Sequence, residues 1–166
     1  MLFRRKIDIV EELRKKGAKI GKDCLICSGL DVFSTEPYLV SVGDNVVIST
    51  DVKFYCHDGS VMVLNKLYNE KNDLMGTIEV GNNCFFGHGA IILRGTKIGD
   101  NCIIGAGAVV KGTFPSNSVI AGVPAKVISN IEEFYKKNKC NLFPTLELSG
   151  DEKRIFFEAK NKEREK

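Results

Sequence analysis

A six-residue period runs without slippage from residue 80 to residue 115 of this 166-residue chain. The successive units read VGNNCF, FGHGAI, ILRGTK, IGDNCI, IGAGAV and VKGTFP, so each opens on a large apolar residue. The fifth position of the first five units is small, and it lies two residues before the next large residue. Side chains two apart share one face of a strand, which predicts short strands with large and small residues pointing inward. The large set is Val80, Phe86, Ile92, Ile98, Ile104 and Val110, and the small set is Cys84, Ala90, Thr96, Cys102 and Ala108.

A longer period appears when these units are grouped in threes. The tetrapeptides VGDN at 42, VGNN at 80 and IGDN at 98 each open a group. Three strands and three corners make one triangular coil, so the sequence predicts an all-β solenoid with coils stacked about 4.8 Å apart. Glycine at the second position of a unit, and glycine or asparagine at the fourth, suit the tight corners.

The cysteines follow the same packing pattern. Residues 84 and 102 are expected to lie against each other in neighbouring coils, so Cys84 and Cys102 are predicted core fillers, and Cys24 occupies an equivalent position. We therefore interpret the six cysteines as thiols and not as a disulfide framework.

Two segments interrupt the repeat. Earlier units open at Ile20, Ile26, Val32, Val42, Ile48 and Phe54. About ten irregular residues around FSTEPYLVS separate the first two coils, and residues 58–77 leave the second coil directly after His57. Insertions in solenoids leave from corners and gather on one face, often the binding face. His57 is therefore predicted to lie beside a cleft.

Both ends of the chain are predicted to be helical. Residues 4–16 place Ile7, Val10 and Leu13 on one side, ending at Gly17, as expected of a helix that covers the open end of the first coil. Residues 128–139 are predicted to form a short helix. Ser149 and Glu152 have the spacing of a capping box before a charged helix. The predicted organisation is an N-terminal helical cap over 1–17, a β-helix over 18–130 with an inserted loop at 58–77, and a C-terminal helical tail over 131–166.

Composition and charge limit the kinds of binding partner that the sequence indicates. With 43% hydrophobic and 27% charged residues the chain has the balance of a globular protein, and a net charge of +3 is too small to define a partner. The sequence has no basic patch interleaved with aromatic residues, which is the pattern that would indicate nucleic-acid binding. No apolar stretch is long enough for a signal peptide or a membrane span, so we expect a cytoplasmic protein.

Several segments resemble a known family. GTKIGDNCIIGAGAVV followed by SNSVIAGVPAKVI closely resembles the hexapeptide-repeat acyltransferases, and the match covers about residues 18–130. EPYLVSVGDNVVIS, HDGSV and NIEEFYKKNK look most like bacterial enzymes that O-acetylate capsular or other surface polysaccharides. The resemblance implies a left-handed parallel β-helix and a homotrimer with active sites between subunits. It also implies acetyl-CoA as the acyl donor and no metal.

The resemblance assigns candidate catalytic and acceptor residues. The family's catalytic histidine falls at His57, which would take the proton of an acceptor hydroxyl and return it to the CoA thiolate. Asp58 would orient the ring or contact the acceptor. Together with Asp58, the candidates for binding the acceptor are Glu36 and Tyr55.

The resemblance also assigns a CoA side. Main-chain groups at His88 and Ala106 are expected along the pantetheine arm, with Gly107 allowing close approach and a backbone N–H there available to an oxyanion. Phe85 stands where the family usually has tryptophan. Lys111 lies one position before the family's usual lysine, and Lys126 stands where the family has a basic residue.

Three alternatives remain open on the sequence. N-acetylation of an amino sugar would use the same histidine. A zinc site like that of γ-class carbonic anhydrases needs three histidines, whereas this chain has two, and Cys56 points away from its neighbour His57. A non-catalytic scaffold is the third, because solenoids often serve as interaction surfaces.

Overall fold

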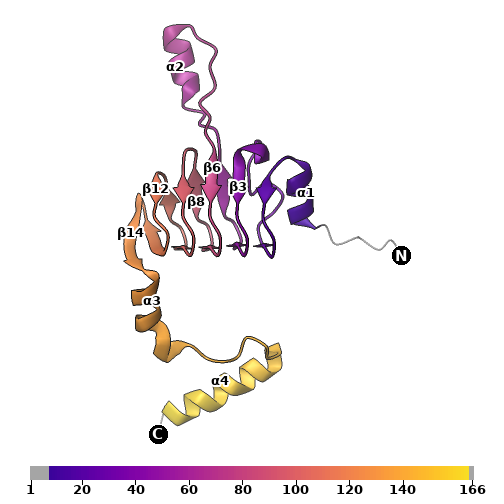
Figure 1. The fold of residues 1–166 in the computed structure, drawn as a ribbon, viewed down its shortest axis with the longest axis vertical. Helices are drawn as coiled ribbons and strands as arrows, with labels where there is room; N and C mark the ends of the chain where they lie inside the picture. The colour runs from indigo at the N-terminus through magenta and orange to yellow at the C-terminus, as the bar shows by residue number, and fades with distance from the viewer. Residues whose placement is uncertain (1–7, 165–166) are drawn as a thin grey trace, which may run out of the picture. The chain divides into compact units, whose positions relative to one another are not determined.

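The computed structural model describes residues 8–164, and its strands wind around one core as three sheets (Figure 1). All pairings between coils are parallel, and only the last strand runs antiparallel. Sheet A holds β1 (Lys19–Ile20), β3 (Val40–Val42), β6 (Ile78–Val80), β9 (Lys97–Ile98) and β12 (Thr113–Phe114). Sheet B holds β2 (Leu25–Ile26), β4 (Val47–Ile48), β7 (Phe85–Phe86), β10 (Ile103–Ile104), β13 (Ser118–Gly122) and β14 (Ala125–Asn130). Sheet C holds β5 (Lys53–Tyr55), β8 (Ile91–Leu93) and β11 (Val109–Val110).

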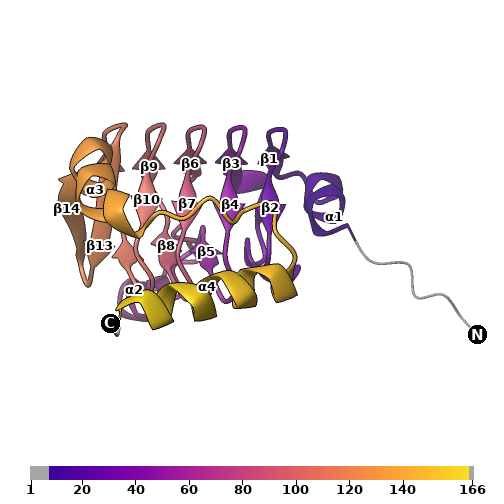
Figure 2. The same cartoon turned by 90° about the horizontal axis from the view of Figure 1, so that it is seen from below.

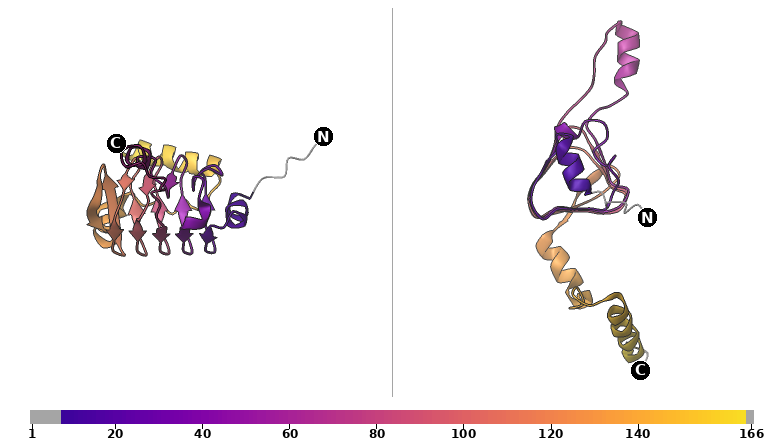
Figure 3. Two further views of the ribbon diagram at one scale, coloured as in Figure 1. Left: turned by 90° about the horizontal axis from the view of Figure 1, so that it is seen from above. Right: turned by 90° about the vertical axis from the view of Figure 1, so that its right-hand side faces the viewer.

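The strand register confirms the predicted coil. In sheet A, Val42 pairs with Val80 and Val80 with Ile98, and equivalent columns run through sheets B and C. Seen along its axis the coil is triangular (Figure 3), and the rungs stack side by side (Figure 2). We name its edges the A–B, B–C and C–A corners, after the sheets that they join.

Large and small side chains alternate inside the coil, as the period predicts. Phe86 is fully buried, and its ring centroid lies 5.3 Å from that of Phe54, which in turn lies 5.0 Å from Phe33. Thr96 is the polar member of the small set, and its hydroxyl donates to the Leu93 carbonyl at 2.6 Å. All five small residues are buried: Cys84, Ala90, Thr96, Cys102 and Ala108.

The A–B corner is held by a ladder of asparagines. The Asn83 amide donates to Asn101 Oδ1 at 2.8 Å, and the Asn101 amide donates to Asn117 Oδ1 at 3.0 Å. All three residues adopt left-handed backbone conformations, with φ between 53° and 62°. Asparagine tolerates this region better than most residues, which explains its recurrence at this position.

Two variants of Asn101 should separate the stability cost of backbone strain from that of losing the hydrogen-bonded ladder. Asn101→Gly keeps the positive φ and loses the ladder, at about 1 kcal/mol per exposed hydrogen bond. Asn101→Ala loses the ladder and places a Cβ in the left-handed region, which costs about 1–2 kcal/mol more. Chemical denaturation of both variants measures the difference in unfolding free energy, and equal stabilities would contradict this account of the corner.

The last coil is shorter than the others and ends in a hairpin. Phe114 pairs with Ile98 although it lies sixteen residues further along the chain instead of eighteen. Strand β14 then pairs antiparallel with β13. Residues 128–130 therefore belong to β14, and the helix predicted over 128–139 was wrong at its start. Helix α3 (Ile131–Asn138) begins after the strand, where Asn130 Oδ1 accepts from the Glu133 N–H at 2.9 Å.

The first coil is covered by α1 (Ile9–Lys15), which confirms the predicted capping helix for the part that the structure describes. Leu13 is fully buried, Val10 packs against the core, and the Asp8 carboxylate caps the first turn. Residues 4–7 of the predicted helix, with Ile7, lie outside the described residues. Between the first two coils the short 3-10 helix η1 (Pro37–Leu39) leads into β3.

The insertion after His57 carries its own helix, α2 (Val61–Tyr68), where the sequence predicted only a loop (Figure 1). The excursion leaves from the C–A corner and returns to β6. None of the α2 residues is buried in the single chain, and its exposed apolar residues are Met62, Val63, Leu64, Leu67 and Tyr68.

The contacts divide the chain into two compact units, and the second begins at Tyr135. It contains the end of α3, the short helix η2 (Lys139–Asn141) and α4 (Gly150–Arg164). Phe143 packs against Phe156 and Phe157. The predicted capping box is confirmed, because the Ser149 N–H donates to Glu152 and the Glu152 N–H donates to the Ser149 hydroxyl. Among the described residues, no helix combines the length and apolar character that crossing a bilayer requires.

Thiol labelling provides a test of the buried columns. Cys27 and Cys140 are exposed, whereas burial raises the pKa of both Cys56 and Cys84 to about 11. Because the thiolate is the reactive form, we expect iodoacetamide at pH 8 to modify the two exposed cysteines first. Cys56, Cys84 and Cys102 should react only in denaturant, as followed by peptide mass spectrometry. Rapid modification of Cys84 in the folded protein would contradict the stacking.

Candidate active site

His57 lies at the C–A corner, two residues after the end of β5, where the coil opens into the insertion. Its Nδ1 lies 2.7 Å from Glu36 Oε2, and the Thr35 hydroxyl lies 3.4 Å from the same ring nitrogen. Glu36 and Thr35 come from the irregular segment between the first two coils. The two interruptions of the repeat therefore meet at one histidine.

The Glu36 carboxylate is suited to hold the ring. Its Oε1 accepts from the Thr35 hydroxyl at 2.5 Å, and hydrogen bonds from Thr35 and His57 lower the pKa of Glu36 below its ordinary value. The Glu36 side chain is 16% exposed and that of His57 is 41% exposed. A carboxylate on Nδ1 accepts the Nδ1–H of a neutral imidazole, which leaves the lone pair of Nε2 free.

The backbone on both sides of His57 is paired. The Gly76 N–H donates to the Cys56 carbonyl, the Asp58 N–H donates to the Leu74 carbonyl, and His57 forms an antiparallel bridge with Met75. The base of the insertion is thus tied to the corner. Cys56 points inward and is fully buried, as expected for the neighbour of an outward-facing residue.

Two hollows open beside His57. One, of about 300 Å³, is lined by His57 and Asp58 with Tyr55, Arg94 and Lys111. The other, of about 550 Å³, lies toward the insertion and is lined by His57 and Asp58 with Thr35, Glu36, Tyr38 and Met75, among others. His57 thus lines both hollows, and each of the candidate acceptor residues Glu36, Tyr55 and Asp58 lines at least one of them.

Asp58 has partners other than the histidine. Its Oδ1 accepts from the Ser60 N–H at 3.0 Å, and its Oδ2 lies 3.6 Å from Arg94 Nε. These contacts, with the nearby charge of Lys111, lower the pKa of Asp58. The sequence suggested that Asp58 either orients the ring or contacts the acceptor. In the structure, the carboxylate in contact with the ring belongs to Glu36.

Most of the candidate CoA residues lie elsewhere, around sheet B and the B–C corner. The Gly107 N–H donates to the His88 carbonyl at 2.9 Å, and Gly107 has a φ of +67°. A side chain at Gly87 would meet the Ala106 nitrogen at 2.5 Å, so the close stacking requires glycine there. The His88 ring contacts the Thr50 hydroxyl at 2.9 Å.

One chain does not bring all the predicted site residues together. Phe85 is 44% exposed on the outer face of sheet B, and Lys126 lies exposed in β14. Lys111, expected on the CoA side, lies in the hollow with His57. The His57 group lies at the C–A corner and the His88 group at the B–C corner, so the two flank sheet C from opposite edges.

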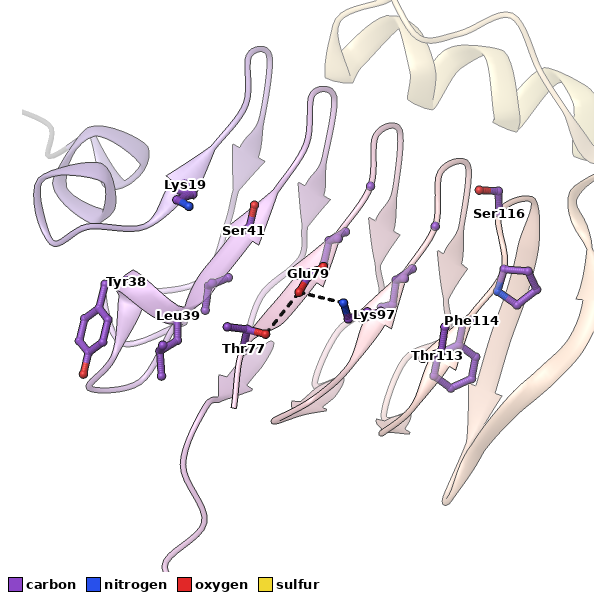
Figure 4. Close-up of a pocket in the computed structure, with 16 residues that line it drawn as sticks. Lys19, Tyr38, Leu39, Ser41, Thr77, Glu79, Lys97, Thr113, Phe114 and Ser116 are labelled. Atoms are coloured by element: carbon purple, nitrogen blue, oxygen red, sulfur yellow. Dashed lines mark hydrogen bonds and ion pairs between the residues drawn. The ribbon is translucent and has the colours of Figure 1, made fainter. Parts of the chain in front are cut away.

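A third hollow lies on the outer face of sheet A and has a volume of about 680 Å³ (Figure 4). Its strands carry polar side chains in register, because Ser41 pairs with Glu79, Glu79 with Lys97, and Lys97 with Thr113. Tyr38 borders both this groove and the hollow at His57.

The sequence indicated the segment STEPY, residues 34–38, as part of the acceptor pocket without singling out Thr35, and Arg94 was missed. Thr35 precedes Glu36 in an irregular segment, so no period indicated its direction. Arg94 had a usable signal, because the register that pairs Tyr55 with Leu93 places the following residues of the two strands side by side at the same corner. In the part of the chain that the structure describes, no cluster of three His, Cys, Asp or Glu side chains has the geometry of a metal site.

Comparison with known proteins identifies the class. Residues 77–112 match the family model described as bacterial transferase hexapeptide (six repeats). The chain is 45% identical to protein CapG of Staphylococcus aureus over 92% of its own length and 89% of that protein. The chain therefore belongs to the hexapeptide-repeat acetyltransferase family.

Solved structures agree with this assignment. A galactoside acetyltransferase in complex with coenzyme A is 27% identical, with a TM-score of 0.62 over 80% of this chain and 76% of that one. A maltose O-acetyltransferase from Clostridium difficile is 26% identical, with a TM-score of 0.56 over 79% of each chain. The expected left-handed parallel β-helix is confirmed.

The contact between Glu36 and His57 predicts the tautomer of the His57 ring. The neutral ring of His57 should populate the Nδ1–H tautomer, because Glu36 accepts that proton. Nitrogen-15 NMR distinguishes the tautomers, and a His88→Gln variant assigns the signals because the chain has two histidines. Glu36→Ala should shift His57 toward the Nε2–H form, whereas an unchanged tautomer would contradict an orienting role for Glu36.

Proposed function

We propose that this protein is an acetyl-CoA-dependent O-acetyltransferase that acetylates a hydroxyl of a sugar, with His57 as the general base. The observation that carries the proposal is the 2.7 Å contact between Glu36 Oε2 and His57 Nδ1. A carboxylate on Nδ1 leaves the Nε2 lone pair free, and His57 lines both hollows where an acceptor would bind. Membership of the acetyltransferase family supports the reaction type, and the galactoside and maltose enzymes support a sugar acceptor.

In the proposed reaction Nε2 takes the proton of the acceptor hydroxyl as its oxygen attacks the thioester carbonyl. Collapse of the tetrahedral intermediate breaks the carbon–sulfur bond, and the imidazolium returns the proton to the leaving thiolate. The products are a sugar acetate and CoA. Glu36 stabilises the imidazolium because its carboxylate already accepts from Nδ1.

The developing oxyanion needs a hydrogen-bond donor. The Gly107 N–H is committed to the His88 carbonyl. Within residues 8–164 the Ala106 N–H has no hydrogen-bond partner, so it is the better candidate of the two. This role at the B–C corner is part of the proposal, as is binding of the pantetheine arm by the main chain near His88.

A homotrimer would complete the site. The His57 group and the CoA group flank sheet C, so a three-fold axis facing sheet C would bring the C–A corner of one copy to the B–C corner of the next. The outward side chains of sheet C support such a contact, since Ile91, Leu93 and Val109 are apolar and only partly exposed in one chain. A capsular or other surface polysaccharide, or its precursor, is the proposed acceptor, which the similarity to CapG supports.

The test compares His57→Ala with the unaltered protein. Acetyl-CoA at a hundred times its dissociation constant should stabilise both by about 2.7 kcal/mol, visible as a rise in melting temperature. Transfer to the acceptor should fall about 10²- to 10⁴-fold in the variant.

Unchanged transfer by His57→Ala would overturn the assignment of the base. If acetyl-CoA stabilised neither protein, the assignment of acetyl-CoA as the acyl donor would be overturned. Release of acetate from the product in mild base identifies an ester, whereas a base-stable product would indicate N-acetylation.

A further inference from the structure

Two cationic side chains lie beside His57 with a single carboxylate between them. Arg94 and Lys111 both line the hollow of about 300 Å³ that His57 borders. Asp58 is the carboxylate in this hollow, and its Oδ1 is already engaged by the Ser60 N–H. Glu36 is paired with the ring of His57 on the other side. The hollow therefore carries an excess of positive charge.

Arg94 is the more buried of the two cations, since Lys111 is exposed. Its Nε is buried without a hydrogen-bond partner, and the nearest carboxylate oxygen, Asp58 Oδ2, lies 3.6 Å away, beyond hydrogen-bonding distance. Within the described residues its terminal nitrogens also make no hydrogen bond, although the side chain is only 23% exposed. A buried guanidinium N–H without an acceptor is unfavourable, so this arrangement is suited to a ligand that supplies one.

Lys111 faces the same space because of the strand register. Ile92 pairs with Val110 in sheet C, so Lys111 follows in the column that already holds Tyr55 and Leu93. An arginine presents a planar fork that matches a carboxylate or phosphate, and a lysine adds a mobile point charge. Together they fit one small anionic group beside the general base.

We propose that Arg94 and Lys111 bind an anionic group of the acceptor sugar, a carboxylate or a phosphate, while His57 deprotonates a hydroxyl of the same sugar. This inference rests on the proposed function and narrows its acceptor to acidic sugars. The phosphates of CoA are separated from the thioester by the pantetheine arm. With the thioester carbon at His57, the anion in this hollow comes from the acceptor.

The first experiment measures acetyl transfer at saturating acetyl-CoA. Methyl glycosides of glucuronic, galacturonic and mannuronic acid are compared with the matching neutral glycosides and with the sugar 6-phosphates. We expect kcat/KM to favour an anionic member by about 10- to 100-fold, as a charge-assisted hydrogen-bond pair provides. Whether the preferred member is a uronoside or a phosphate identifies the group.

Variants then test whether Arg94 causes the preference for anionic acceptors. Arg94→Gln should abolish the preference for anionic acceptors, while the KM for acetyl-CoA and the rate of transfer to neutral glycosides stay within about threefold. Arg94→Lys should restore part of the preference. Lys22→Gln, at the distant A–B corner, is the matched control for net charge and should keep the full preference. Equal loss for neutral and anionic acceptors in Arg94→Gln, or a raised KM for acetyl-CoA, would overturn the proposal.

Binding without turnover separates this inference from the proposed function. In a His57→Ala background saturated with CoA, the preferred anionic glycoside should raise the melting temperature, and His57→Ala/Arg94→Gln should lose that rise. No binding by any anionic probe, or equal binding by both proteins, overturns the anion site even if acetyl-CoA still stabilises the enzyme. If the enzyme preferred succinyl-CoA to acetyl-CoA and Arg94→Gln lost this preference, the anion would belong to the acyl group. That result would also overturn the proposal.

Discussion

The parallel ladder between successive coils is the constraint on which the rest of the structure depends. Every strand must pair with the strand one coil away, so each inward side chain stacks on its counterparts along the axis. Large and small residues must therefore alternate in every coil, and the corners must repeat the same backbone. The asparagine ladder through Asn83, Asn101 and Asn117 shows how strictly one corner conformation is repeated.

A regular coil of this kind offers few places for chemistry, because its inward positions are filled and its corners are tight. The exceptions are the segments where the period fails. The irregular segment before β3 supplies Thr35 and Glu36, and the insertion with α2 begins one residue after His57. Both segments line the larger hollow at His57, and the insertion also lines the smaller one. The site thus depends on the repeat for rigidity and on its interruptions for space.

The charges at this corner divide into two groups. Glu36 is committed to His57, and its lowered pKa keeps the carboxylate ionised beside a ring that must become positive during the proposed transfer. Asp58, Arg94 and Lys111 form the second group, with more positive than negative charge. The first group accounts for the base, and the second for the kind of acceptor that we infer.

The coil, its register, the buried columns and the position of His57 at a corner all follow from the sequence alone, because a six-residue period leaves one way to bury its large residues. The sequence did not determine which carboxylate meets the histidine. Asp58 is adjacent in sequence, but Glu36, twenty-one residues away, makes the contact, since the path of an irregular segment follows no period. It also misplaced the start of α3, because pairing with β13 holds residues 128–130 in a strand. The register places Arg94 and Lys111 at the corner of His57, but the period does not show that they line one hollow with His57 and Asp58, because the path of the insertion follows no repeat.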